Sequence, residues 1–171
     1  MEDPRLLLRR LKLGREEYCQ RLLTMLVLEA PYPRWNTRSA PSRRGLAFLR
    51  AVDVLSYGES RLPGDAVFVD ELDLPARHQH EPGGAPDYGV LASDRLWMIE
   101  LKTDRASHRR GQIPTYFELA QHHHPGRSID LTYLTPPWSS WTTSRRMAGT
   151  HTFPGTRCCP WCCRRGGTRS E

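Results

Sequence analysis

The fold of this chain is decided by residues 86–102, which read PDYGVLASDRLWMIELK. Residues 87–92 and 95–102 are rich in apolar, aromatic and β-branched side chains, and this composition predicts two strands. Ser93 and Asp94 separate the two segments, so we expect a tight β-hairpin, although the turn lacks the glycine that such turns prefer.

The second strand of this hairpin carries polar groups among apolar ones. Side chains two residues apart share a face of a strand, so Glu100 and Lys102 are expected to point to the same side. Apolar residues occupy both faces, with Leu96 and Met98 on the Glu100 face and Trp97, Ile99 and Leu101 on the other. The strand is therefore expected to be covered on both sides, where a carboxylate and an ammonium are costly unless they are paired or bound to metal.

The lysine stands out against the rest of the chain, which contains 23 Arg and only two Lys, Lys12 and Lys102. A Lys ammonium is a compact charge whose pKa responds to burial and neighbours, whereas Arg stays protonated. The hairpin would also bring Asp87 beside Glu100. Two such carboxylates suit Mg²⁺ or Mn²⁺, and a neighbouring ammonium suits the charge that develops in phosphodiester hydrolysis.

The remaining sequence predicts an α/β domain around the hairpin. Apolar periodicity and capping residues predict helices over 3–13, 15–30, 43–56 and 112–122. Short apolar segments predict further strands over 66–74 and 129–134, and the Pro, Gly and His of 75–86 predict a loop.

The pattern Pro86-Asp87 followed by Glu100-Leu101-Lys102 resembles that of the PD-(D/E)xK nuclease superfamily. The common core of this superfamily runs helix, three strands, helix, strand, which is the order predicted above. Gln112 and Tyr116 also match the Q-x-x-x-Y signature of the branch related to the nuclease domains of recombination helicase complexes. The resemblance covers residues 15–135 and implies a restriction-endonuclease-like core with extra N-terminal helices.

The resemblance also implies roles for individual residues. Asp87 and Glu100 would bind Mg²⁺ or Mn²⁺ together with the backbone carbonyl of Leu101, and Lys102 would assist the attacking water. Gln112 and Tyr116 would position the substrate or the lysine. Many members carry an acidic residue on the first core helix, for which the candidates are Glu16, Glu17 and Glu29, with Glu17 preferred.

The charge of the chain is unevenly distributed. The net charge is +6, but residues 1–135 contain 19 basic and 18 acidic residues, so the predicted catalytic part is almost neutral. DNA, the expected partner, would then be bound by local clusters, and not by a global field. The clearest such cluster consists of Arg105, His108, Arg109 and Arg110.

Residues 136–171 differ in kind from the predicted nuclease-like domain, 1–135. No Leu, Ile or Val occurs after Leu134, so this segment has little aliphatic surface to bury and is expected to be a poorly ordered tail. A switch of reading frame in a GC-rich gene would produce such a composition. The tail also holds four cysteines, for which a metal role with Cys19 is the less favoured interpretation: Cys158, Cys159, Cys162 and Cys163.

Other features are given weaker interpretations. Asp70, Glu71 and Asp73 are read as a solvated strand end, with the alternative that one of them reaches the metal through water. The histidines at 122–124 are expected at an exposed helix end. No apolar segment approaches the length of a membrane span, and no signal peptide is recognised, so we expect a cytoplasmic protein.

Three hypotheses follow from the sequence. The first is a Mg²⁺-dependent deoxyribonuclease of the PD-(D/E)xK type. The second is a catalytically inactive protein or truncated remnant that keeps the nuclease fold and binds nucleic acid, because the abnormal C-terminus replaces what normally packs after the last core strand. The third is a zinc-binding interaction protein organised by the terminal cysteines.

Overall fold

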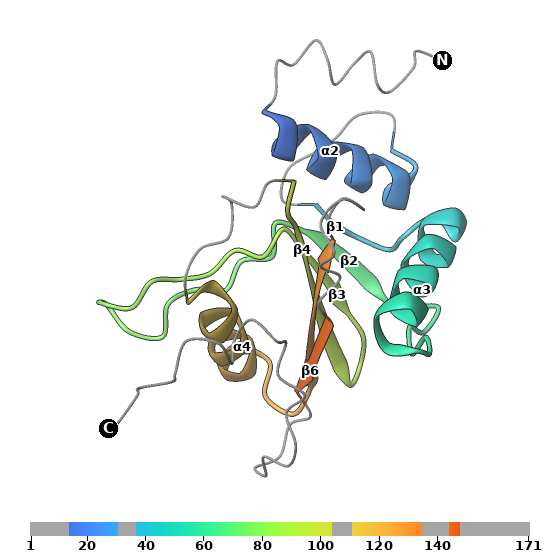
Figure 1. Ribbon diagram of the computed structural model, residues 1–171. Helices are drawn as coiled ribbons and strands as arrows, with labels where there is room; N and C mark the ends of the chain where they lie inside the picture. The colour runs from blue at the N-terminus through green and yellow to red at the C-terminus, as the bar shows by residue number, and fades with distance from the viewer. Residues whose placement is uncertain (1–13, 31–36, 104–110, 135–143, 148–171) are drawn as a thin grey trace, which may run out of the picture.

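The structure of the protein is a computed structural model, which describes residues 14–30, 37–103, 111–134 and 144–147. These residues form a mixed α/β fold in which a single sheet lies between helices (Figure 1). The helices are α2 (Arg15–Leu28), α3 (Arg43–Tyr57) and α4 (Gln112–His123). No helix in these residues is both long and apolar enough to cross a membrane.

The sheet has six strands in the order in which they occur in the sequence. They are β1 (Arg38–Ser39), β2 (Val67–Asp70), β3 (Tyr88–Leu91), β4 (Arg95–Leu101), β5 (Ser128–Leu134) and β6 (Ser144–Met147). All neighbouring strands are antiparallel except β4 and β5, which are parallel. A parallel pair needs a crossover connection, and α4 lies in that connection.

Most of the predicted elements are confirmed to within a few residues. The predicted hairpin is the antiparallel pair β3 and β4, and the predicted helices over 15–30, 43–56 and 112–122 are α2, α3 and α4. The strand predicted over 66–74 is shorter, because β2 ends at Asp70 and Glu71 adopts a left-handed φ of 56°. The helix predicted over 3–13 lies outside the described residues.

Most of the predicted tail also lies outside the described residues. Its residues 144–147 form β6, which pairs with β5 from Ile129 to Thr132. The composition of the tail did not predict this strand.

Each face of the sheet carries its own apolar core, because side chains alternate along the strands. On one face α4 packs against side chains of β3, β4 and β5, including Leu96, Met98 and Leu131. On the other face α2 and α3 pack against a cluster that contains Trp97 and Ile99. Figure 1 shows α4 on one side of the sheet, α3 on the other, and α2 across one end of it. The prediction that β4 is covered on both sides is confirmed, since its first six residues are buried.

The contact between α2 and α3 depends on a glycine. A Cβ atom on Gly45 would lie 1.8 Å from the carbonyl oxygen of Val27, so no other residue fits there without moving a helix. The side chain of Ser42 accepts a hydrogen bond of 2.9 Å from the N–H of Gly45 and so caps α3. The same turn is tied to α2 by the N–H of Ser42, which donates to the Val27 oxygen at 2.9 Å.

A buried ion cluster joins α3 to the sheet at the end away from residue 100. The guanidinium of Arg95, which is 2% exposed, lies 2.8 Å from a carboxylate oxygen of Asp53 and 2.6 Å from one of Asp130. Tyr57 and Trp97 present their rings to the same guanidinium, each with its centroid 5.2 Å away. Both carboxylates pair with the same buried guanidinium, so the opposite charges of the Arg95 cluster stabilise one another.

Candidate active site

The hairpin brings two carboxylates to one end of the sheet. The register pairs Tyr88 with Ile99, so Asp87, which precedes β3, lies opposite Glu100. The N–H of Asp87 donates to Glu100 Oε2 at 3.2 Å, and the N–H of Leu101 donates to Asp87 Oδ2 at 2.6 Å. Asp87 and Glu100 therefore lie side by side, as the hairpin predicted.

Lys102 completes this group. Its Nζ lies 2.6 Å from Glu100 Oε1, and both side chains are buried, with 5% of Lys102 and 2% of Glu100 exposed. The backbone N–H of Lys102 donates to the carbonyl of Leu134 at 2.9 Å, so β5 holds the end of β4 in place. Such a pair attracts more strongly than an exposed one, because less water screens it.

Gln112 and Tyr116 reach the same carboxylate from α4. Gln112 Nε2 donates to Glu100 Oε1 at 2.8 Å and to the Tyr116 hydroxyl at 2.7 Å. The Tyr116 hydroxyl in turn donates to the carbonyl of Ala85 at 3.2 Å. Their helical spacing of four residues places both side chains on one face, directed at the site.

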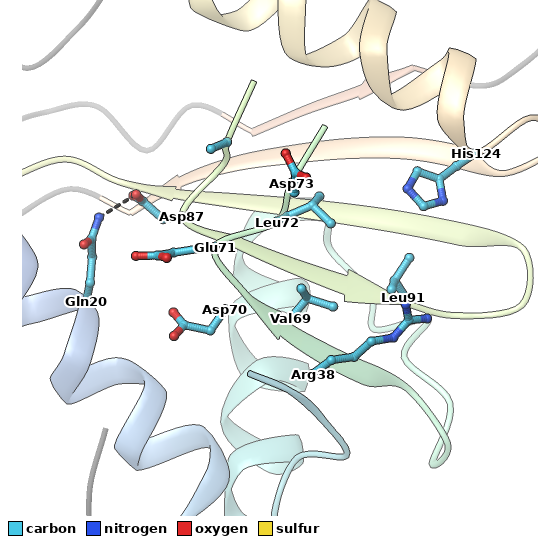
Figure 2. A pocket seen from close by; sticks show the side chains of 11 residues that line it. Gln20, Arg38, Val69, Asp70, Glu71, Leu72, Asp73, Asp87, Leu91 and His124 are labelled. Atoms are coloured by element: carbon cyan, nitrogen blue, oxygen red, sulfur yellow. Dashed lines mark hydrogen bonds between the residues drawn. The ribbon is translucent and has the colours of Figure 1, made fainter. Parts of the chain in front are cut away.

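Helix α2 contributes two residues to the site, and neither was the first choice of the sequence prediction. Glu16 Oε1 lies 3.9 Å from Lys102 Nζ, and Gln20 Nε2 donates to Asp87 Oδ1 at 2.5 Å (Figure 2). Residues 16 and 20 are four apart, so they share one face of the helix. This spacing is the sequence signal by which Gln20 could have been found.

For the acidic residue of the first core helix, the structure favours Glu16 over the preferred Glu17. The α2 carboxylate beside the cluster is that of Glu16, because one residue along a helix turns the side chain by about 100°. Glu29 caps the opposite end of α2 and lies 3.5 Å from Arg44.

The electrostatics of the site are dominated by the burial of Asp87 beside a second acid. Burial, and then repulsion from Glu100, raise the pKa of Asp87 to about 7. The N–H of Leu101 and the ammonium of Lys102 oppose this shift without cancelling it. The site thus holds more negative charge than its single ammonium neutralises.

A divalent cation would neutralise this excess of negative charge. Asp87 and Glu100 supply carboxylate oxygens and Leu101 a main-chain carbonyl, a set that leaves positions for the waters that Mg²⁺ or Mn²⁺ keeps. Over the four described segments, no group of three or more His, Cys, Asp or Glu side chains is arranged to hold a metal ion. The candidate ligand set at Asp87 contains only two such side chains, since its third ligand would be a main-chain oxygen.

Two cavities flank the segment that leads into Asp87. The larger, of about 720 Å³, includes Asp87 and Gln20 in its wall. The smaller, of about 570 Å³, is lined in part by Gly84, Gln112 and Tyr116. Gln112 Oε1 is buried and accepts no hydrogen bond from the described residues, so one acceptor beside the smaller cavity is unused.

The acidic cluster at the end of β2, formed by Asp70, Glu71 and Asp73, is only in part the solvated strand end that the sequence suggested. Asp70 is fully buried, and Arg21 of α2 lies 2.6 Å from it and 3.0 Å from Glu71. The hydroxyl of Thr24 adds a hydrogen bond to Asp70 at 3.2 Å. Only Asp73 of this cluster is exposed. The interpretation failed because the basic partner comes from a helix 49 residues earlier in the chain.

The other predicted clusters are described only in part. The histidines at 122–124 end α4, where His123 Nε2 lies 2.7 Å from the carbonyl of Pro75. Cys19 is a free thiol on α2. The basic cluster at 105–110 and the four cysteines of the tail lie outside the described residues.

Comparisons with known proteins identify no relative. No family model matches the sequence, and neither the search of curated proteins nor that of solved structures found a match.

Proposed function

We propose that this protein is a metal-dependent nuclease that hydrolyses DNA phosphodiester bonds with Mg²⁺ or Mn²⁺. The observation that carries the proposal is the joint position of Asp87, Glu100 and Lys102 at the end of one hairpin. The two carboxylates are linked through backbone N–H groups, and the ammonium lies 2.6 Å from one of them. Buried ionisable groups with a perturbed pKa are typical of functional sites.

The arrangement of the elements supports a restriction-endonuclease-like core. Elements α2, β2, β3, β4, α4 and β5 occur in the order helix, three strands, helix, strand, with β1 and α3 inserted after α2. The strand that carries Glu100 and Lys102 is central in the sheet and parallel to β5. Gln112 and Tyr116, the two residues of the Q-x-x-x-Y signature, contact the site and each other. This agreement supports the resemblance to PD-(D/E)xK nucleases.

Each side chain has a distinct task in this proposal. The cation would be held by Asp87, Glu100 and the Leu101 carbonyl, and it would supply charge that polarises a phosphoryl group and acidifies water. Lys102 presents an ammonium beside Glu100, where it can stabilise negative charge on an attacking oxygen. Gln112 helps to orient Glu100 through a hydrogen bond from its uncharged amide group. Asp87 must be ionised to ligate, so the affinity for the cation should increase as the pH rises through about 7.

The proposal is tested by cleavage of plasmid and single-stranded DNA. Lys102→Ala and Glu100→Ala should each lower the rate at least about 100-fold, since each removes a group from the reacting centre. Asp65→Asn, a change of an exposed carboxylate, should leave the rate unchanged and serves as the matched control. Circular dichroism melting would establish that all variants are folded.

The same experiment separates the alternatives. Metal-dependent cleavage that survives in both site variants would refute the proposal. DNA binding with no cleavage by the unaltered protein would favour the inactive nuclease-fold protein instead. Stoichiometric zinc that depends on Cys159 and Cys162 would favour the zinc-binding interaction protein.

A further inference from the structure

The larger cavity extends from Asp87 along the α4 face of the sheet. At one end lie Asp87 and Gln20, and at the other lie Arg38 and His124 (Figure 2). Apolar side chains of the strands form its middle part, among them Val69 and Leu91. The cavity thus joins the candidate metal site to a basic end across an apolar floor.

The basic end of the cavity holds a guanidinium and an imidazole that have no acidic partner among the described residues. Arg38 and His124 form no ion pair with any residue in the described part of the chain. The pKa of His124 is lowered, first by burial and then by repulsion from Arg127, His123 and Arg38. An anion bound at this end would pair with the Arg38 guanidinium and accept a hydrogen bond from the His124 imidazole.

The strand register gives the distance between the two ends. Arg38 pairs with Val69, which pairs with Gly89, two residues beyond Asp87. With about 3.3 Å per residue and about 4.8 Å between strands, the Cα atoms of Arg38 and Asp87 are about 12 Å apart. At roughly 3.4 Å for each nucleotide along a stacked strand, and more for a stretched one, about two to four nucleotides cover this distance.

Four acidic residues line the cavity, namely Asp70, Glu71, Asp73 and Asp87. Asp70 and Glu71 are already paired with Arg21, so their charge is partly neutralised. Asp87 offers cation-binding oxygens at one end of the cavity, and Arg38 and His124 offer phosphate-binding groups at the other.

We propose that this cavity binds a single-stranded segment of DNA next to the scissile phosphate, and that Arg38 and His124 bind a phosphate two to four nucleotides away from it. The inference rests on the proposed nuclease function and adds the path of the substrate strand. The imidazole of His124 can donate one N–H to a phosphate oxygen even when it is neutral. Val69 and Leu91 would contact the apolar faces of the intervening nucleotides.

Fluorescence anisotropy with end-labelled oligothymidylates tests this path. The full chain is titrated with a strand of about 12 nucleotides and with a dinucleotide, in buffer with Ca²⁺ in place of Mg²⁺. Arg38→Gln and His124→Gln should each weaken binding of the longer strand about fivefold, and Arg38→Gln, which removes a charge, should also reduce its salt slope by about 0.7. Binding of the dinucleotide, which is too short to reach Arg38, should not change.

Two control variants exclude a general loss of charge or of folding. Arg43→Gln changes an exposed arginine of α3 outside this cavity and should bind the longer strand as the unaltered protein does. Arg38→Lys keeps the positive charge and should retain most of the affinity. Equal binding of the longer strand by Arg38→Gln and the unaltered protein would overturn the inference, as would no binding by the unaltered protein.

Cleavage of the same oligothymidylates in Mg²⁺ distinguishes this inference from the proposed function. If the unaltered protein binds through Arg38 but does not cleave, the nuclease function is refuted and the phosphate site remains. If it cleaves and Arg38→Gln and His124→Gln cleave the longer strand equally well, the function stands and the proposed strand path is refuted.

Discussion

The raised pKa of Asp87 predicts that this one carboxyl group makes folding stability depend on pH. In the folded protein its pKa is about 7, against an ordinary value of 3.8. Between these values the unfolded chain has lost the proton while the folded chain keeps it, so the unfolded state binds fewer protons. The free energy of unfolding must therefore fall as the pH rises from about 4 to about 7. Asp87→Asn removes the titrating group and should remove this part of the pH dependence.

The size of the effect follows from the shift. Each pKa unit corresponds to about 1.4 kcal/mol, and the interval from about pH 5 to the folded-state pKa of about 7 spans about two units. The free energy of unfolding should thus fall by about 3 kcal/mol more in the unaltered protein than in Asp87→Asn between about pH 5 and about pH 8. The Asn side chain can still accept the hydrogen bond that the N–H of Leu101 gives to Asp87, so the hairpin should persist in the variant.

Urea denaturation followed by tryptophan fluorescence measures this difference, because Trp97 is fully buried between the sheet and the helices. Asp65→Asn is the control, since Asp65 is exposed and its loss should leave the pH dependence as it is. Millimolar Mg²⁺ should recover stability at about pH 8 in the unaltered protein but not in Asp87→Asn, if Asp87 holds the cation. Identical pH dependence in Asp87→Asn and the unaltered protein would refute the electrostatic reasoning.

Two further predictions concern stability. Gly45→Ala should lower the free energy of unfolding by at least about 3 kcal/mol in a urea titration, because its Cβ would lie 1.8 Å from the Val27 oxygen. Gly64→Ala, where nothing lies within 4 Å, should have little effect, and equal losses in the two variants would contradict the packing argument. Arg95→Met should cost about 3–5 kcal/mol, since two buried carboxylates lose their shared cation, while Arg43→Met on the exposed face should cost little. A fully stable Arg95→Met protein would show that the Arg95 cluster does not stabilise the fold.

Local sequence patterns predicted the elements and the centre of the site for a physical reason. In a hairpin of two short strands, the turn length determines which residues face each other, so Asp87 and Glu100 could be paired from the sequence. The two-residue period of a strand likewise placed Glu100 and Lys102 on one side. The four-residue spacing of Gln112 and Tyr116 placed both on one helix face. In each case neighbours in the sequence carry the information, because backbone geometry relates them directly.

The parts that the sequence did not reveal all depend on contacts between distant segments. The choice of Glu16 over Glu17 is made by the rotation of α2 about its axis, which packing against the sheet decides. The partner of Asp70 is Arg21, 49 residues away, so Asp70 looked solvated although it is buried. The strand β6 forms because the edge of β5 offers it backbone hydrogen bonds, whatever its composition.

The sequence by itself therefore determined the α/β order, the hairpin and the residues of its carboxylate and lysine group, because local periodicity and turn length encode them. Only the tertiary structure decided which α2 side chains reach that group, how far the pKa of Asp87 rises, and where a cavity connects Asp87 to Arg38. Those properties depend on burial and on the distances between charges from separate elements, and neither is present until the helices have packed against the sheet.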